Sequence, residues 1–297
     1  MTNIHDVAVI GGGTMGCGIA ETFAKNGFNV AVIEKSQADV ARVELAIDLS
    51  LKKQLEKWRI TEAEKKITLS HLEVTTDFER VKNVDLVIES VYEDFVTKKE
   101  VLQRCDRLAR PGVIFASNTS ALSLTELAAA TERPDKVIGL HFLYPVGTRN
   151  LVEIVRALKT SDETVAAAKE IVDQLAKVSV EVYESPGFVT TRLMMTVINE
   201  ALRVLMEGVA TAREIDIAMK LGYDFQYGPL EAADRFGLDA VLAAMEHLYR
   251  EFGEPKYRPA PLLKKMVRAN QLGVKTGEGF FRYNEDGERI LEEETGQ

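Results

Sequence analysis

The stretch VAVIGGGTMGCGIAETFAKNGFNVAVIE, residues 7–34, decides the fold of this chain. It begins with a short apolar run rich in β-branched residues, turns at three glycines, continues in a helical pattern to about Gly27 and ends in a second apolar run, 29–33. A buried strand, a glycine turn, a helix and a second buried strand are typical of the opening of a doubly wound parallel sheet. The sequence therefore predicts an α/β fold of Rossmann type.

The glycine turn has the spacing of a dinucleotide-binding motif, Gly11-x-Gly13-x-x-Gly16, with Thr14 and Met15 inside it. In such a motif the first glycine permits a tight turn, and the second lets the backbone approach a pyrophosphate. The third glycine lets the helix pack closely on the sheet. The helix that follows offers unpaired N–H groups and partial positive charge to the phosphates. We expect these five residues to bind a dinucleotide.

Glu34 follows the second apolar run, 18 residues beyond Gly16. A carboxylate at this position accepts hydrogen bonds from the adenosine ribose and repels the 2′-phosphate of NADP. Lys35 comes next, but a single lysine does not outweigh the carboxylate. The motif therefore favours NAD over NADP, and a flavin is less favoured because the rest of the chain does not suit it.

Further alternation of strands and helices predicts one α/β domain over residues 1–185. The expected strands are 84–89, 113–117, 136–142, 151–155 and 178–182, and the expected helices are 98–108, 122–131 and 162–175. A lysine-rich helical excursion occupies about 37–67 and contains Lys52, Lys53, Lys57, Lys65 and Lys66. An exposed helical face explains such lysines without any ligand.

No strand-like run follows Ser185, which predicts a second, all-helical domain over 186–297. Apolar residues recur at helical spacing in 188–206, 212–221 and 238–252. The acidic tail Glu292-Glu293-Glu294 is expected to be solvated or frayed.

The composition indicates an ordinary globular protein of 297 residues, with 46% hydrophobic residues and a net charge of −9. The acidic balance argues against nucleic-acid binding and against an anionic membrane surface. Only two cysteines occur, far apart, and they predict neither a disulfide framework nor a metal site. The first residues lack the charged and apolar regions of a signal peptide, and no run approaches a membrane span. We expect a cytoplasmic protein.

Two ionisable residues lie on neighbouring predicted strands. His141 ends one apolar strand, Glu153 lies in the next, and both are equally far from Gly147 at the centre of the connecting loop. In an antiparallel hairpin they would be opposite each other. A carboxylate beside an imidazole fixes its tautomer and stabilises the imidazolium, which is a common arrangement for a general base. A strand-end histidine with a purely structural role is the alternative.

The segment Ser117-Asn118-Thr119-Ser120 follows another predicted strand, at the edge where open α/β sheets bind ligands. Its hydroxyl and amide groups suit a substrate oxygen and a nicotinamide ribose. Helix capping is an equally good explanation from the residues alone.

These features together resemble the L-3-hydroxyacyl-CoA dehydrogenase family over essentially the whole chain, from Val7 to Tyr283. The motifs that carry the resemblance are 11–16, 117–120, His141-Phe142, 151–153, Pro186-Gly187-Phe188-Val189, Gly228-Pro229-Leu230-Glu231 and Lys275-Thr276-Gly277-Glu278-Gly279-Phe280. The resemblance implies NAD-dependent oxidation of a (3S)-hydroxyacyl-CoA and a homodimer formed by the helical domain.

Residue roles also follow from this resemblance. It implies that His141 is the general base, that Glu153 is its partner and that Ser120 contacts the reacting oxygen. Glu93, Lys98 and Asn118 match positions near the nicotinamide and its ribose, and Lys275 matches a lysine that reaches the cofactor. The lysine-rich excursion matches the segment that helps to hold the CoA nucleotide.

Two residues of the substrate pocket depart from the family pattern. Tyr144 stands where the family has asparagine in His-Phe-x-Asn-Pro, and Thr191 replaces the asparagine of Gly-Phe-Val-x-Asn-Arg. Both changes alter the shape and the hydrogen bonding of the expected acyl pocket, and lost donors can slow a reaction strongly. The two departures therefore predict an atypical acyl group or a weak activity. Tyr144 and Thr191 can also compensate for each other locally.

Two other functions remain open from the sequence. One is an NAD-dependent dehydrogenase of a free 3-hydroxy acid, as in L-gulonate dehydrogenase and λ-crystallin. The other is an NAD-binding or structural relative without turnover. The lysine-rich excursion favours a CoA thioester, and the pair His141 and Glu153 favours an enzyme.

Overall fold

The computed structural model describes residues 4–290, and the chain divides into two units, Met1–Ser185 and Pro186–Gln297. The acidic tail at 292–294 lies outside the described residues. Each unit has its own hydrophobic core.

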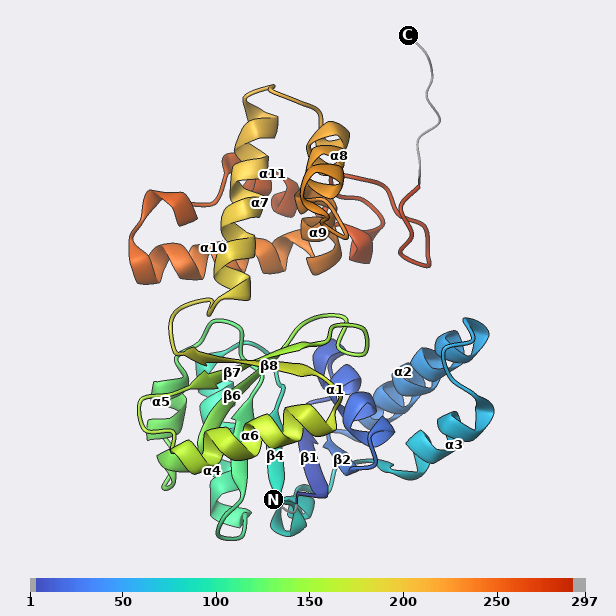
Figure 1. Ribbon diagram of the computed structural model, residues 1–297, viewed down its shortest axis with the longest axis vertical. Coiled ribbons are helices and arrows are strands. Elements are labelled where there is room, and N and C mark those ends of the chain that lie inside the picture. Colours follow the sequence, from blue (N-terminus) through green and yellow to red (C-terminus); the bar gives the residue numbers. More distant parts are fainter. Residues whose placement is uncertain (1–3, 291–297) are drawn as a thin grey trace. The chain divides into compact units, whose positions relative to one another are not determined.

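The first unit is an eight-stranded sheet with helices on both faces (Figure 1). Its strand order is β3-β2-β1-β4-β5-β6-β7-β8. The strands are β1 (Asp6–Ile10), β2 (Asn29–Ile33), β3 (Leu72–Thr75), β4 (Leu86–Glu89), β5 (Ile114–Ser117), β6 (Val137–Phe142), β7 (Leu151–Arg156) and β8 (Val178–Tyr183). The helices are α1 (Thr14–Lys25), α2 (Gln37–Glu56), α3 (Glu62–Ser70), α4 (Phe95–Leu108), α5 (Leu124–Ala129) and α6 (Asp162–Gln174), with short 3₁₀ turns at Phe78–Asn83 and Pro134–Lys136.

Strands β1 to β6 run parallel, so their carboxyl ends meet at one edge of the sheet. Strand order reverses between β1 and β4, which is the position where open α/β sheets bind ligands. One row of the register joins Ile33, Ile10, Glu89 and Ser117 across this edge. The doubly wound fold predicted from residues 7–34 is confirmed.

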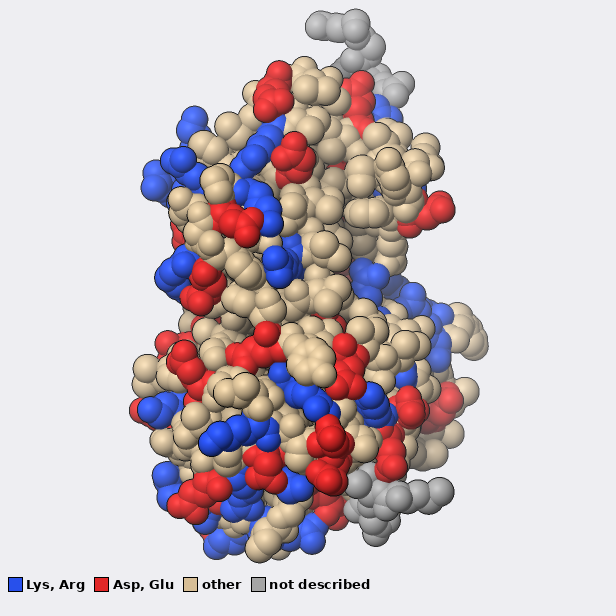
Figure 2. Space-filling model, turned by 60° about the vertical axis from the view of Figure 1, so that its left-hand side comes forward, with Lys and Arg blue, Asp and Glu red and all other residues tan. Residues whose placement is uncertain are grey.

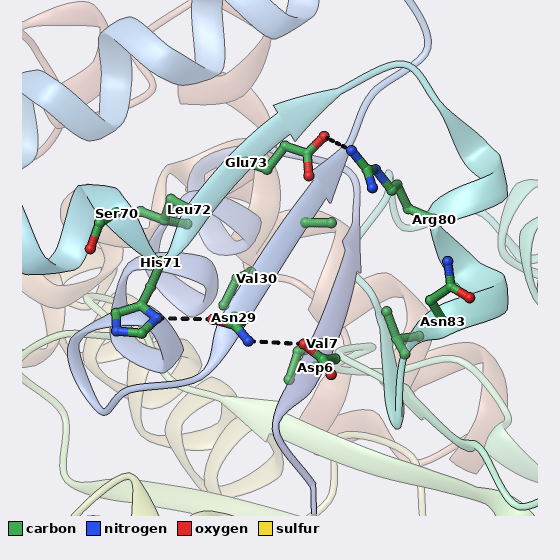
Figure 3. Close-up of a pocket in the computed structure, with 12 residues that line it drawn as sticks. Asp6, Val7, Asn29, Val30, Ser70, His71, Leu72, Glu73, Arg80 and Asn83 are labelled. Atoms are coloured by element: carbon green, nitrogen blue, oxygen red, sulfur yellow. Dashed lines mark hydrogen bonds and ion pairs between the residues drawn. The ribbon is translucent and has the colours of Figure 1, made fainter.

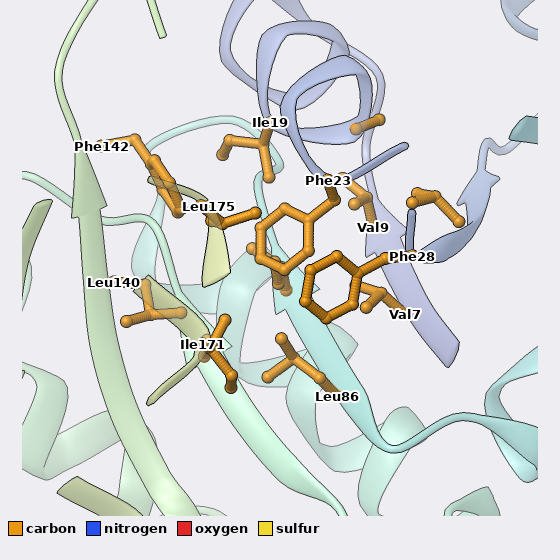
Figure 4. Close-up of a cluster of buried hydrophobic side chains, with 14 of the residues drawn as sticks. Val7, Val9, Ile19, Phe23, Phe28, Leu86, Leu140, Phe142, Ile171 and Leu175 are labelled. Carbon is orange, nitrogen blue, oxygen red and sulfur yellow. The ribbon is translucent and has the colours of Figure 1, made fainter. Parts of the chain in front are cut away.

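A single apolar cluster fixes α1 on the sheet (Figure 4). The Phe23 ring packs edge-on against the rings of Phe28 and Phe142, with centroids 5.1 Å and 6.3 Å apart. Phe142 is the residue after His141, so the packing of α1 also fixes the end of β6. The core thereby connects the glycine turn with the predicted catalytic strand.

Several predicted boundaries need correction. Strand β3 was not predicted, because Leu72–Thr75 is short and only half buried. Helix α4 begins at Phe95 rather than at Lys98, since Asp94 caps it by accepting a hydrogen bond from the Thr97 N–H. The helical excursion extends to Ser70 and breaks into α2 and α3.

The second unit is built of helices around the core of α7 and α10. Its helices are α7 (Thr190–Met206), α8 (Ala212–Tyr223), α9 (Pro229–Phe236), α10 (Leu238–Phe252) and α11 (Pro261–Arg268), with 3₁₀ turns at Pro255–Tyr257 and Val274–Thr276. Helices α9 and α11 were not predicted, because each has only eight residues. Isolated bridges pair Gly273 with Glu278 and Glu278 with Arg282.

Acidic and basic side chains are interspersed on the face shown in Figure 2. On the helical excursion, Asp48 of α2 forms ion pairs with Lys52 of the same helix and with Lys65 of α3. No helix of residues 4–290 is long and apolar enough to cross a membrane.

Candidate active site

The glycine turn leaves room for a pyrophosphate at the start of α1. Gly11 has a φ of +94°, a conformation that L side chains rarely adopt. A Cβ at Gly16 would lie 1.9 Å from the Gly11 carbonyl oxygen, whereas a Cβ at Gly13 would meet nothing within 4 Å. Gly13 also caps α1 without a side-chain hydrogen bond. The backbone therefore fits a dinucleotide phosphate at the N-terminus of α1.

Thr14 and Met15 form the first turn of this helix. Thr14 is exposed, and Met15 is partly buried against the core of the first unit. Their backbone N–H groups belong to the first turn, where N–H groups have no partner within the helix. A ligand phosphate can accept hydrogen bonds from such groups.

Glu34 stands at the end of β2 and closes the glycine turn. Its Oε1 accepts a hydrogen bond of 2.7 Å from the Gly12 N–H, and its Oε2 accepts one of 3.2 Å from the Lys35 N–H. Arg42 of α2 donates to the same Oε1 at 3.3 Å. Arg42 was not predicted as a site residue. The carboxylate is thus held in place where the ribose hydroxyls of a bound dinucleotide are expected.

His141 and Glu153 form a buried pair at the carboxyl edge. The register of the antiparallel strands β6 and β7 pairs the two residues, as predicted from the centre of their loop. His141 Nδ1 lies 2.6 Å from Glu153 Oε2, and the residues are 6% and 1% exposed. A carboxylate at Nδ1 holds the ring proton there, so Nε2 carries the lone pair of the neutral ring. This geometry suits a general base.

The turn after β5 is tied to both neighbouring strands. Asn118 Oδ1 accepts a hydrogen bond of 3.0 Å from the Phe142 N–H, directly after His141. The Ser120 N–H donates to Glu93 Oε1 at 2.9 Å, and the Thr119 hydroxyl donates to the same oxygen at 2.6 Å. The structure therefore brings Glu93, Asn118 and Ser120 to the same sheet edge as His141.

Glu93 binds these groups as an anion. Its burial alone would raise the pKa of the carboxyl group, but the ammonium of Lys98 and the hydrogen bonds from Thr119 and Ser120 outweigh that effect. The net result lowers the pKa of Glu93 below its usual value. Glu93 is therefore ionised at neutral pH and accepts hydrogen bonds from the turn.

Lys98 is enclosed in the protein, contrary to what direct cofactor contact would require. It is 1% exposed, and its ammonium lies 2.7 Å from Glu89 Oε1, 3.2 Å from the Val91 carbonyl oxygen and 3.2 Å from Glu93 Oε2. A lysine has three N–H donors, and these three acceptors engage them. Glu89, which was not predicted as a site residue, also accepts a hydrogen bond of 2.6 Å from the buried Ser117 hydroxyl. The sequence signal that could have identified Glu89 is a charged residue at the end of a fully buried strand.

Tyr144 belongs to the loop between β6 and β7 and is 45% exposed. Lys177 holds this loop, because its ammonium donates to the carbonyl oxygens of Val146 and Arg149, both at 2.7 Å. Burial lowers the pKa of Lys177. Tyr144 therefore belongs to a loop that Lys177, the residue before β8, holds in place.

Lys275 and Thr191 belong to the second unit. Lys275 forms an ion pair with Asp239 at the start of α10, and Thr191 lies in the first turn of α7. The segment that carries Lys275 is held by the buried Asp234. One Asp234 oxygen accepts from the Phe280 N–H, and the other accepts from the Phe281 N–H and the Tyr283 hydroxyl, each at 3.0 Å.

The pKa of Asp234 makes the stability of the segment 273–283 pH-dependent. Burial raises the pKa to about 6 despite these hydrogen bonds, whereas the usual value is 3.8. The folded state therefore binds the proton more tightly, and its extra stability, present below pH 4, is lost as pH rises through about 6. The shift corresponds to a free energy on the order of 3 kcal/mol.

Hydrogen exchange of residues 273–283 measures this effect. Between pH 4 and 7, protection corrected for intrinsic exchange rates is expected to fall in the wild type relative to Asp234→Asn, which cannot titrate. Protection that rises with pH relative to the variant would show that the hydrogen bonds outweigh burial.

A shallow pocket of the first unit lies elsewhere (Figure 3). Its lining includes Asp6, Asn29, His71 and Leu72, which begin or precede β1, β2 and β3. These residues mark the amino edge of the sheet, opposite the glycine turn. The pocket is therefore separate from the candidate site. Among residues 4–290, no group of histidine, cysteine or acidic residues is placed to hold a metal ion.

Comparison with known proteins agrees with this arrangement. Residues 6–185 match the family model of the 3-hydroxyacyl-CoA dehydrogenase NAD-binding domain, and residues 187–283 match that of the C-terminal domain. A 3-hydroxybutyryl-CoA dehydrogenase of Clostridioides difficile is 47% identical over 94% of this chain and 99% of its own length. The crystal structure of (S)-3-hydroxybutyryl-CoA dehydrogenase from Ralstonia eutropha has a TM-score of 0.89 and 44% identity, and the match covers 95% of this chain and all of that chain.

A mitochondrial hydroxyacyl-coenzyme A dehydrogenase of Rattus norvegicus is also similar, with 38% identity over 94% of this chain and 91% of its own length. The similarity thus extends over both units and includes bacterial and mammalian dehydrogenases. This chain belongs to the 3-hydroxyacyl-CoA dehydrogenase family and is an NAD-dependent oxidoreductase of 3-hydroxyacyl-CoA thioesters.

Proposed function

We propose that this enzyme interconverts (3S)-3-hydroxybutyryl-CoA and acetoacetyl-CoA, with His141 as the general base. The buried pair of His141 and Glu153 at the carboxyl edge of the sheet is the observation that carries the proposal. The relatives named as 3-hydroxybutyryl-CoA dehydrogenases support a short acyl group, and one of them is named as the (S) enzyme.

In the oxidative direction, His141 Nε2 accepts the proton of the substrate 3-hydroxyl group. Bound NAD supplies the hydride acceptor for the hydrogen on C3. Glu153 keeps the ring oriented and stabilises the imidazolium that forms. Ser120 contacts the reacting oxygen, and Asn118 orients the nicotinamide ribose. Gly11, Gly13, Thr14, Met15 and Gly16 hold the pyrophosphate, and Glu34 binds the adenosine ribose.

We assign different roles to Glu93 and Lys98. Glu93 positions the turn at Ser120 through the hydrogen bonds that it accepts. Lys98 is buried and keeps Glu93 and Glu89 in place through its ion pairs with both carboxylates. Contact of Lys275 with the cofactor remains a prediction, and so does contact of the lysines of α2 and α3 with CoA.

The remaining proposals concern assembly and location. We assign residues 1–185 to NAD binding and residues 186–297 to substrate binding and dimerisation. Helices α7 and α8 expose Leu193, Ile217 and Leu221, the last at 82%, and such apolar groups favour burial in a homodimer. A cytoplasmic location is supported by the two cysteines, Cys17 and Cys105, which are both free thiols.

Oxidation of NADH in the presence of either acetoacetyl-CoA or free acetoacetate tests the function. The proposal predicts fast turnover of the thioester and little turnover of the free acid. Turnover of the free acid alone would support the 3-hydroxy acid dehydrogenase instead. NADH binding without turnover of either compound would support a non-catalytic relative.

The double substitution Tyr144→Asn and Thr191→Asn tests whether these positions set the acyl preference. We expect kcat/KM for acetoacetyl-CoA to change by about tenfold or more relative to longer 3-oxoacyl-CoA substrates, because pocket contacts discriminate by about 10–200-fold. The single variants show which of the two positions carries the effect. An unchanged chain-length profile would remove both residues from substrate selection.

A further inference from the structure

Arg42 connects the end of β2 with the glycine turn. Its Nη1 donates to the Gly12 carbonyl oxygen at 3.2 Å, and its Nη2 donates to Glu34 Oε1 at 3.3 Å. The same carboxylate oxygen accepts the Gly12 N–H at 2.7 Å. Arg42, Glu34 and Gly12 therefore form one cluster at the position expected for the adenosine ribose.

The local fold brings Arg42 to this position. Ser36 caps α2 directly after β2, with its hydroxyl accepting a hydrogen bond from the Asp39 N–H. The helix then places Arg42 back over the turn, where its guanidinium also lies 3.6 Å from Asp39. The two side chains differ in exposure, 53% for Arg42 and 10% for Glu34.

Charge decides what each side chain can bind. The enclosed carboxylate of Glu34 favours ribose hydroxyls and repels a 2′-phosphate. The guanidinium is held mainly by carboxylates, and its planar N–H groups fit a phosphate in the same way. Because its side chain is half exposed, Arg42 can turn towards an incoming anion. While Glu34 is present, this cation is partly neutralised by it.

We propose that Arg42 is a second determinant of cofactor selection, which pairs with Glu34 in the NAD-preferring enzyme and binds a 2′-phosphate when Glu34 is removed. The inference rests on the proposed placement of the adenosine ribose at Glu34. The preference for NAD is then a property of the pair. Removing Glu34 alone admits NADP, whereas removing both residues admits it poorly.

Binding of NADH and NADPH, measured by fluorescence titration without substrate, tests this in four proteins: wild type, Glu34→Ala, Arg42→Ala and the double variant. Glu34→Ala is expected to tighten NADPH binding by about tenfold or more, since hydrogen bonds to charged groups span about 10–100-fold. In the double variant most of this gain is expected to disappear. Arg42→Ala alone is expected to bind NADPH more weakly than the wild type does.

Lys35→Ala in the Glu34→Ala background is the matched control, because Lys35 is an exposed cation next to the same carboxylate. It is expected to retain the gain. The inference is overturned if Glu34→Ala and the double variant bind NADPH within about twofold of each other. A difference that small is expected when two substitutions act independently, and it would mean that Arg42 does not contribute to the gain. The inference is also overturned if Lys35→Ala removes the gain in NADPH affinity and Arg42→Ala does not.

Adenosine 2′,5′-bisphosphate, titrated by calorimetry, provides a readout confined to the adenosine end. Its affinity is expected to rise in Glu34→Ala only when Arg42 is present. If the wild type binds neither NADH nor NADPH, the proposed cofactor site itself fails. If the wild type binds NADH but NADPH binding is the same in all variants, the enzyme's function stands and the role of Arg42 is refuted.

Discussion

Replacement of His141 with alanine is expected to lower kcat by about 10²–10⁴-fold, the usual contribution of a positioned general base. The residue is 6% exposed and its ring is hydrogen-bonded to Glu153, so the ring is fixed where it can accept a proton. NADH affinity is expected to remain close to that of the wild type, because the glycine turn and Glu34 do not depend on this ring. Steady-state kinetics and NADH titration measure the two effects separately.

His71→Ala is the matched control. His71 lies at the amino edge of the sheet, where its Nδ1 is 3.0 Å from Asn29 Oδ1 (Figure 3). Its removal is expected to leave kcat unchanged. Glu153→Gln should give a kcat between those of the wild type and His141→Ala, because an amide cannot stabilise the imidazolium. Parallel loss of turnover and NADH affinity in His141→Ala would contradict the assigned role.

The position of this pair was accessible from the sequence because its determinants are local. Two apolar strands joined by a short loop form a hairpin, and the distances of His141 and Glu153 from Gly147 set the register. The glycine turn was predictable for the same reason, since its strand, turn and helix are consecutive. Such features need only the alternation of apolar runs and glycines.

Contacts between distant segments were not accessible in this way. A lysine near the start of an amphipathic helix usually reaches solvent, so nothing local indicates that Lys98 points down to Glu89. Arg42 was missed because its contact with Gly12 depends on where α2 begins and how it packs against α1 and β3. Both residues acquire their roles from tertiary packing.

Lys98→Met is expected to destabilise the first unit by about 3–5 kcal/mol, the usual cost of breaking a buried ion pair by removing one partner. Glu89 is 0% exposed, and among residues 4–290 its carboxylate would keep only the Val91 N–H and the Ser117 hydroxyl as hydrogen-bond donors. Calorimetric unfolding measures the loss, and NADH identifies the transition of the cofactor-binding unit because a ligand stabilises the unit that binds it. Lys99→Met, on the same helix but less buried, is expected to change stability by less than about 0.5 kcal/mol.

Glu89→Gln combined with Lys98→Met separates the cost of the unpaired Glu89 charge from the loss of the other contacts of the Lys98 ammonium. With both charges removed, a substantial part of the lost stability is expected to return, because no uncompensated charge remains buried. Turnover should recover less than stability, since Glu93 would still lack the ammonium that holds it against the turn at Ser120. Equal recovery of both would mean that Lys98 acts on the fold alone. A double variant as unstable as Lys98→Met would mean that the contacts of the Lys98 ammonium with the Val91 carbonyl oxygen and Glu93, rather than the uncompensated charge of Glu89, account for the lost stability.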